Sequence, residues 1–190
     1  AIVIGVGLNW LWGKKVAITD MPQMVALFNG MGGGSAAAIG AVEMVRWSAA
    51  GQSPGLVPAV LAVLGSLIGA VSLTGSVIAW AKLDGRMDKR YTFPGQQWFN
   101  AGVAVAAVVC GVMALQTLTM PWIVAFFALS LALGVLMTLP IGGADMPVVI
   151  SLYNALTGLA VAFEGYVLGI ETLIIAGMMV GAAGILLTRL

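Results

Sequence analysis

The sequence contains no histidine and only one cysteine. A chain without histidine and with Cys110 alone cannot build a disulfide, a Cys/His zinc site or a Cys–His catalytic pair from its own residues. The single thiol lies within an apolar run and is expected to serve as a small packing group. We therefore expect no metal site in this chain and no catalysis by cysteine or histidine.

Charge is also scarce, because 8% of the 190 residues are charged, whereas soluble domains carry about 25%. The hydrophobic fraction is 61%, which is more than a soluble fold of this length could bury. The net charge of +1 gives no reason to expect a nucleic acid partner. This composition predicts an integral protein of the lipid bilayer.

Long apolar segments are abundant, and most of them are long enough to span the hydrocarbon core as helices. The fold class predicted is all-α, a polytopic transmembrane bundle of about seven helices that forms one domain over residues 1–190. The first segment is short and the chain begins without Met, so we expect it to be part of a longer polypeptide. The segments cover residues 1–13, 21–45, 56–81, 98–116, 120–139, 146–169 and 171–188.

The distribution of lysine and arginine predicts the orientation of the helices. If the segments alternate across the bilayer, seven of the eight cationic residues fall on one side, and only Arg46 falls on the other. Cytoplasmic loops carry such an excess. We therefore expect the C-terminus and three loops to be cytoplasmic in a cell inner (plasma) membrane. These loops are residues 14–20, 82–97 and 140–145.

An internal repeat relates residues 20–42 to residues 145–167 without a gap. The helices that follow are also alike, with GSLIGAVSLTG (65–75) set against GMMVGAAGILL (177–187). An even number of crossings separates the two units, so they are expected to run parallel, as in many transporters. The identical pairs include Asp20/Asp145, Pro22/Pro147, Asn29/Asn154, Gly33/Gly158, Ala37/Ala162 and Gly40/Gly165.

Each repeat unit places an asparagine within an apolar helix. Asn29 lies nine residues after Asp20, roughly 13 Å along the helix, and Asn154 lies at the matching depth. An unpaired amide in hydrocarbon is costly, so each side chain must face protein or water. Two interpretations stay open, namely interhelical hydrogen bonding and a polar path through the membrane.

Small and polar residues share the helix faces that carry these amides. Ser151, Thr157 and Gly158 lie on the face of Asn154, while Gly32 and Gly33 lie on the face of Asn29. Glycines allow another backbone to approach closely or leave space for water. Such amides and hydroxyls can position water but do not titrate near neutral pH, so a proton carrier would have to come from elsewhere.

The carboxylates are expected to lie near the membrane surfaces. Asp20 and Asp145 each precede Met-Pro at a helix start, where they suit N-caps, and they could also face a cytoplasmic partner. Glu43 and Glu164 fall near the opposite helix ends, in the predicted interface, and Glu171 falls in the short turn there.

Three stretches of this sequence resemble the membrane domain of the β subunit of proton-translocating NAD(P)+ transhydrogenase. They are TDMPQMVALFNGMGGGSAAAIGAVE, LIGAVSLTGSVIAWAKL and IGGADMPVVISLYNALTGLAVAFEGYVLG. The resemblance covers essentially the whole chain. It implies an enzyme in which hydride passes between NAD(H) and NADP(H) while the membrane domain conducts protons.

The resemblance also implies partners and cofactors. Soluble domains would bind NAD(H) and NADP(H), the latter encoded after residue 190, and no nucleotide site lies in this chain. Helices of the α subunit would complete the membrane domain and supply the proton-carrying histidine, because Asn29 stands where many members have it. Gln23 replaces a glutamate seen in some members. A dimer of αβ units is the implied assembly.

Site roles follow from the same resemblance. Asn29, Asn154, Thr157 and Ser151 are expected along the proton path. Asp145, with Asp20 as its repeat counterpart, is expected to communicate with the NADP(H) domain. The alternatives are a stand-alone secondary transporter that binds a solute at the polar face, and a purely structural scaffold.

Overall fold

The computed structural model describes residues 2–52, 54–87 and 89–189, and these residues form helices and loops without a strand. Residues 1 and 190 of the predicted domain lie outside the described residues. Six of the helices are long and apolar enough to cross a membrane, which confirms the predicted all-α polytopic bundle. The helices are α1 (Ile2–Lys15), α2 (Met21–Ala50), α3 (Leu56–Leu83), α4 (Gln96–Thr117), α5 (Met120–Thr138), α6 (Met146–Leu168) and α7 (Glu171–Arg189).

The two repeat helices begin and end in the same way. Pro22 and Pro147 lie in the first turns of α2 and α6, where the missing N–H of proline is not needed. Gly51 and Gly169 end these helices in the left-handed conformation, with φ of 60° and 68°. Glycine adopts this conformation at no steric cost, which is why it commonly ends helices.

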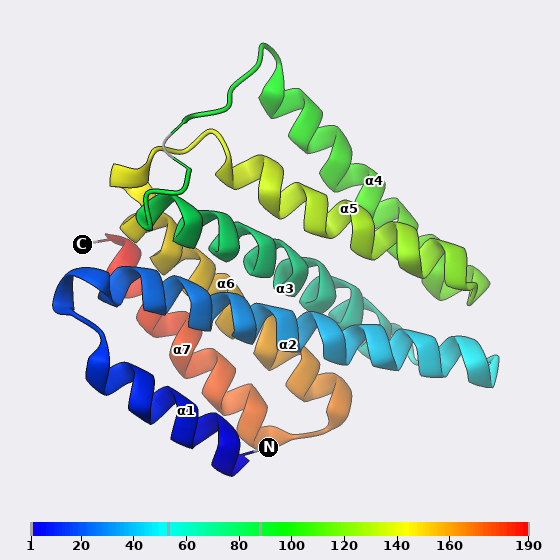
Figure 1. The fold of residues 1–190 in the computed structure, drawn as a ribbon. Helices are drawn as coiled ribbons and strands as arrows, with labels where there is room; N and C mark the ends of the chain where they lie inside the picture. The colour runs from blue at the N-terminus through cyan, green and yellow to red at the C-terminus, as the bar shows by residue number, and fades with distance from the viewer. Residues whose placement is uncertain (1, 53, 88, 190) are drawn as a thin grey trace.

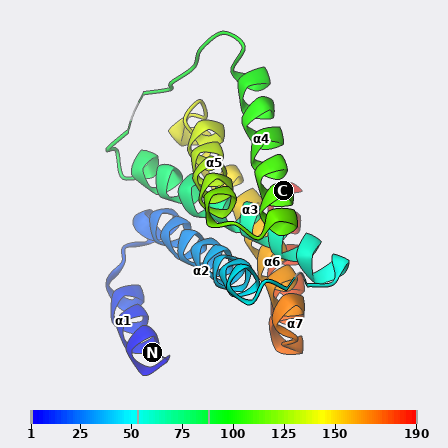
Figure 2. The ribbon, with the colours of Figure 1, turned by 90° about the vertical axis from the view of Figure 1, so that its right-hand side faces the viewer.

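Helix α3 occupies the middle of the bundle and packs against α2, α5 and α6 (Figures 1 and 2). Helix α4 flanks α5 on one side, and α7 flanks α6 on the other. Helix α1 lies apart from this bundle, and the rings of Trp12 and Phe28 make an edge-to-face contact between α1 and α2 at 6.3 Å.

Helices α2 and α3 cross where Gly33 meets Gly69, and α6 and α7 cross in the same way where Gly158 meets Gly177. A β-carbon placed on Gly69 would lie 2.6 Å from the oxygen of Gly33 and 2.8 Å from the nitrogen of Ala37. A β-carbon placed on Gly177 would lie 2.5 Å from the corresponding atoms of Gly158 and Ala162. Both pairs of helices therefore approach at backbone distance, as small residues permit in membranes.

These contacts correct the predicted register of the second helix in each unit. The sequence comparison set Gly65 against Gly177, whereas the crossing geometry makes Gly69 the counterpart of Gly177. The prediction was wrong by one helical turn, because α3 and α7 both carry glycines at a four-residue spacing and sequence alone cannot choose between the two alignments.

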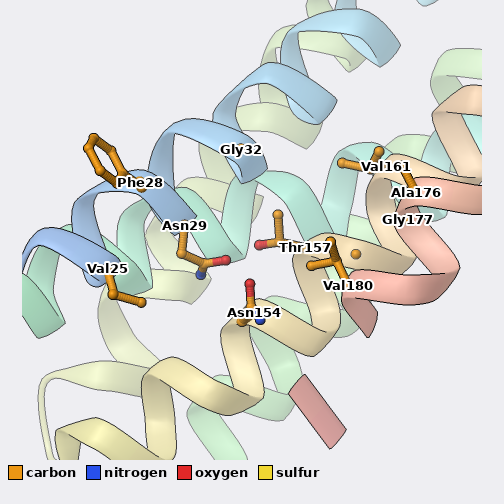
Figure 3. A pocket seen from close by; sticks show the side chains of 11 residues that line it. Val25, Phe28, Asn29, Gly32, Asn154, Thr157, Val161, Ala176, Gly177 and Val180 are labelled. Carbon is orange, nitrogen blue, oxygen red and sulfur yellow. The ribbon is translucent and has the colours of Figure 1, made fainter. Parts of the chain in front are cut away.

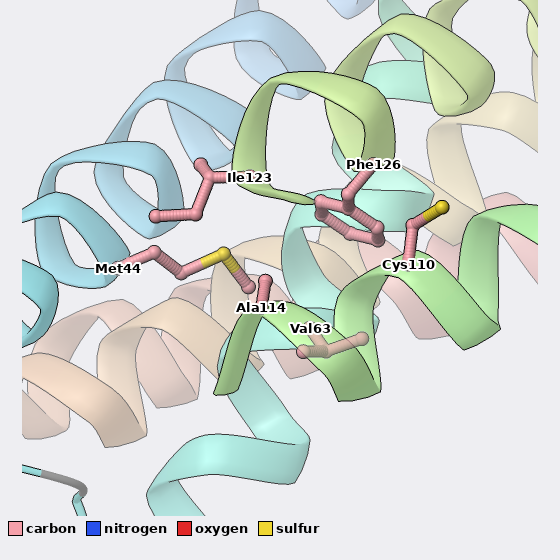
Figure 4. Close-up of a cluster of buried hydrophobic side chains, with 6 residues drawn as sticks. All are labelled: Met44, Val63, Cys110, Ala114, Ile123 and Phe126. Atoms are coloured by element: carbon pink, nitrogen blue, oxygen red, sulfur yellow. The ribbon is translucent and has the colours of Figure 1, made fainter. Parts of the chain in front are cut away.

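A hydrophobic cluster joins α4 and α5 to the central helices (Figure 4). Phe126 of α5 is fully buried, and its ring lies against Gly111 of α4, where an added β-carbon would be 3.1 Å from it. Cys110 is buried beside it, in agreement with its predicted role as a packing group. The cluster consists of Met44, Val63, Cys110, Ala114, Ile123 and Phe126.

The loops predicted to share one side of the membrane gather at one end of the bundle (Figure 1). Arg90 forms an ion pair with Asp145 there, with 3.6 Å between Nη2 and Oδ2. The buried ammonium of Lys82 donates to the backbone oxygens of Thr138, Leu139 and Ile141, at 3.3, 2.5 and 2.5 Å. Lys82 therefore connects the end of α3 to the loop that precedes α6.

Two glutamates are more buried within the bundle than the sequence indicated. Glu164 is fully buried and Glu43 is 9% exposed, whereas both were expected in the membrane interface. The positions along the helices were right, but the side chains point into the bundle. The burial of Glu164 depends on Gly40 and Gly65 of the neighbouring helices, which the pattern of a single helix does not show.

Candidate functional site

The Asn29 amide lies in a polar cluster between α2, α3 and α6. Its Nδ2 donates to the hydroxyl of Ser76 at 2.8 Å and to that of Ser72 at 3.3 Å. The Asn29 side chain is buried, and its Oδ1 has no hydrogen-bond partner among the described residues. A buried amide oxygen without a partner is costly, so this atom is suited to accept a hydrogen bond from water or from another chain.

Hydroxyl groups continue the cluster across to α6. The hydroxyls of Ser72 and Thr157 lie 2.5 Å apart, and Ser72 Oγ also approaches the backbone oxygen of Tyr153 at 3.3 Å. All three residues are buried. Because each hydroxyl both donates and accepts, the hydrogen bond between Ser72 and Thr157 can change direction, while Asn29 Nδ2 always donates to Ser72.

A cavity of about 400 Å³ lies beside this cluster, between α2, α6 and α7. The side chains of Asn29, Thr157 and Asn154 point toward one another at its wall (Figure 3). Val25 and Val180 also line the cavity and are 48% and 42% exposed, so it opens on the outer surface of the bundle.

Asn154 has no side-chain hydrogen bond to any part of the chain that the structure describes. The corrected register gives the reason. Ser72 and Ser76, which bind Asn29, correspond to Val180 and Gly184 in the second unit, and neither can bind an amide through its side chain. The two asparagines match in sequence but not in their surroundings.

The predicted site residues divide into those that meet at the cavity and those that do not. Ser151 is half-buried but does not line the cavity, and its hydroxyl makes no hydrogen bond among the described residues. Gly32 lies at the cavity, where a β-carbon would be 3.2 Å from Thr157 Cγ2. Gly33 and Gly158 lie at the helix crossings described above.

Asp20 and Asp145 lie apart from the cavity, at the N-cap positions of α2 and α6. Both side chains are exposed, and neither carboxylate accepts the expected capping hydrogen bond from a backbone N–H group of the described first turn. The short 3-10 turns Ile18–Asp20 and Gly143–Asp145 hold both residues in the helical region of backbone conformation, which does not present the carboxylate to the first-turn N–H groups.

Ser72 and Ser76 were not among the predicted site residues, because they lie on α3, outside the repeat of residues 20–42 and 145–167. A signal was present, since two serines four residues apart share one face of an otherwise apolar helix. The sequence also left the role of Gln23 open. The Gln23 amide donates to the backbone oxygen of Leu83 at 3.2 Å, next to the end of α3.

The full chain, residues 1–190, matches the sequence model of the family described as NAD(P) transhydrogenase beta subunit. The chain belongs to this family. The NAD(P) transhydrogenase subunit beta of Rhodospirillum rubrum is 40% identical over an alignment 193 residues long, which covers 99% of this chain and 42% of that protein. A second sequence of that name, from a defined strain of the species, has the same identity and coverage. The chain thus spans less than half the length of these transhydrogenase subunits.

The different surroundings of the two asparagines predict different effects on stability. Asn29→Leu should lower the free energy of unfolding by about 1–2 kcal/mol, because it breaks two buried hydrogen bonds to serine hydroxyls. Asn154→Leu should change it little, because Asn154 has no such bonds. Thermal unfolding of the purified complex measures both changes, and equal losses in the two variants would contradict the assignment.

Proposed function

We propose that this chain is the proton-conducting membrane part of a transhydrogenase, which couples proton translocation to hydride transfer between NAD(H) and NADP(H). Family membership supports the reaction, and the polar cluster at the cavity supports the conducting role. The observation that carries the proposal is the Asn154 amide, which has no hydrogen-bond partner among the described residues yet lies beside the hydrogen-bonded Asn29, Ser72 and Thr157.

The cavity fits a helix from the α subunit as its missing wall. It opens on the outer surface of the bundle, where an apolar helix would bury Val25 and Val180. A histidine on that helix would meet two unsatisfied amide groups, those of Asn154 and Asn29 Oδ1. Neutral hydrogen-bond partners would hold one tautomer of the imidazole, so its free nitrogen could bind and release a proton.

The charged end of the bundle is the proposed docking surface for the soluble NADP(H)-binding domain. The exposed Asp20 and Asp145 lie at the starts of α2 and α6, the two helices that carry the asparagines. A displacement of the N-terminal end of either helix would therefore move an asparagine side chain at the cavity. We assign this end to the cytoplasm because it collects the lysine and arginine residues, and we assign the complex to the cell inner membrane as a dimer of αβ units.

Nothing in the cavity favours a stand-alone ion-coupled transporter. The residues that line it are apolar side chains, glycines, two asparagines and one threonine, without a carboxylate to carry a coupling proton or bind a cation. A proton path whose titratable group lies on a partner chain is consistent with this lining, because it needs no carboxylate here.

The test uses the complete complex in sealed liposomes with the soluble domains outside. Added NADPH and an oxidised NAD analogue should drive hydride transfer, followed by absorbance, together with internal acidification, followed by a quenched dye. Asn154→Leu should lower both rates about tenfold or more, because the proton-carrying group loses a hydrogen-bond partner that positions it or its water. The matched control Asn9→Leu, at an exposed amide of α1, should leave both rates unchanged.

Normal acidification by Asn154→Leu would remove the amide from the proton path and leave it as a packing group. If the wild-type complex transferred hydride but showed no protonophore-sensitive acidification, the conducting role itself would be overturned.

A further inference from the structure

A second polar site lies beyond the hydroxyl cluster, toward the opposite end of the bundle. The Glu164 side chain is fully buried near the end of α6. Its Oε1 accepts a weak hydrogen bond from Ser66 at 3.4 Å, and its Oε2 has no partner among the described residues. A carboxyl group buried in a membrane helix bundle without full hydrogen bonding is unusual and calls for a functional explanation.

The neighbouring helices form a slot for this carboxyl group. A β-carbon placed on Gly65 of α3 would lie 2.5 Å from Glu164 Oε1, and one placed on Gly40 of α2 would lie 2.7 Å from the same atom. In the first repeat unit the position of Glu164 is occupied by Ile39. The helix crossing therefore does not require an acid, and the slot accommodates a group that only the second unit carries.

The charged residues near Glu164 belong to α2. Glu43 on α2 interacts with it electrostatically and is itself paired with Arg46, with 2.6 Å between Oε1 and Nη1. The facing residue of α3 is the neutral Ser66, and Glu171 of α7 is exposed. An ionised Glu164 would thus have no cation beside it among the described residues, which is costly for a buried charge, so it carries a proton unless water or a counter-charge reaches it.

Glu164 is in line with the polar cluster. Thr157 and Glu164 are seven residues apart on α6, about 10 Å along the helix, and both contact serines of α3. Beyond Glu164, the Glu43–Arg46 pair extends to the surface, where the Arg46 side chain is 70% exposed. These groups form a series from the cavity at Asn154 to the end of the bundle opposite Asp145.

We propose that Glu164 is a second proton-binding site, which transfers protons between the Asn29–Thr157 cluster and the surface at Glu43 and Arg46. This inference rests on the proposed proton-conducting function. The step is a proton transfer alone, in which one carboxylate oxygen binds a proton and later releases it, and no other bond changes. Water entering the slot or movement of Arg46 would supply the stabilisation that the ionised form needs.

The test compares variants of the complete complex in the liposome assay. Glu164→Gln keeps the shape and can still accept a hydrogen bond from Ser66, but it cannot exchange a proton. We expect acidification to fall below about one tenth of the wild-type rate. Glu171→Gln, which removes an exposed carboxylate at the same end of the bundle, should pump normally. Glu164→Asp keeps a carboxyl group and should retain part of the activity.

A purely structural role gives the opposite pattern, with Glu164→Gln pumping normally and Glu164→Asp impaired because the shorter side chain leaves the slot partly empty. That result would overturn this inference while leaving the proposed function in place, since the wild-type complex would still acidify the liposomes. Failure of the wild-type complex to acidify would instead reject the conducting function.

Infrared difference spectroscopy provides a readout that does not depend on turnover. A change of pH should alter a carbonyl-stretch band of a protonated carboxylic acid in the wild-type complex and in Glu171→Gln. This band should be missing from Glu164→Gln and shifted in Glu164→Asp. A band that persists in Glu164→Gln, or one that is constant at every pH, would show that Glu164 does not exchange its proton.

Discussion

Replacing Gly158 with alanine is expected to destabilise the complex strongly, because the crossing of α6 and α7 has no room for a methyl group. The added carbon would lie 2.6 Å from the backbone oxygen of Gly177 and 2.8 Å from the α-carbon of Gly181, closer than real contacts allow. These are backbone atoms of a helix, so the helices themselves must separate. We expect a loss of about 3 kcal/mol or more in unfolding free energy.

Gly102→Ala in α4 is the matched control for this change. A β-carbon at Gly102 meets no atom within 4 Å, and alanine favours a helix over glycine by about 1 kcal/mol. The control should therefore keep or raise the thermal unfolding midpoint of the purified complex, whereas Gly158→Ala should lower it and reduce the yield of assembled protein. Equal midpoints in the two variants would contradict the close crossing.

Lys82→Met should loosen the connection between α3 and the loop before α6. Methionine keeps the length of the side chain but removes the ammonium group that binds the backbone oxygens of Thr138, Leu139 and Ile141. Hydrogen bonds from a charged donor to buried acceptors contribute about 1.5–3 kcal/mol each, and the three oxygens would lose their common donor. We expect a loss of about 3 kcal/mol in total, since such contributions are not additive.

Hydrogen–deuterium exchange locates this effect. In Lys82→Met, amides of the segment 139–145 should exchange faster than in the wild type, while those of the α6–α7 crossing should be unchanged. The control Lys15→Met alters an exposed lysine of α1 and should affect neither region. Unchanged exchange at 139–145 would show that the loop is held by other contacts, such as the ion pair of Arg90 with Asp145.

Because Asp145 ends this loop, Lys82→Met also bears on coupling. If the proposed docking of the NADP(H)-binding domain acts through Asp145, a looser loop should reduce proton pumping more than it reduces the binding of NADPH. The liposome assay and a nucleotide titration measure the two quantities separately.

The positions of the helices along the chain, and of residues along each helix, could be predicted from the sequence. Helix positions follow from runs of apolar residues, since every backbone polar group in a membrane must be paired within a helix or barrel. The structure begins α2 at Met21 and α6 at Met146, with Pro22 and Pro147 in their first turns, as the repeat indicated. The equal distances of Asn29 and Asn154 from their helix starts could also be predicted, because a helix rises by a fixed amount per residue.

The sequence alone thus determined the membrane class, the helical segments, the internal repeat and the presence of two amides at one depth. Only the tertiary structure decided that Asn29 is held by Ser72 and Ser76 while Asn154 is not, and that Glu164 is buried in a slot made by Gly40 and Gly65. The physical reason is that the partners of a side chain depend on how two helices slide and rotate against each other. In this chain that register is set by close contacts of glycines, whose four-residue spacing in sequence fits more than one alignment.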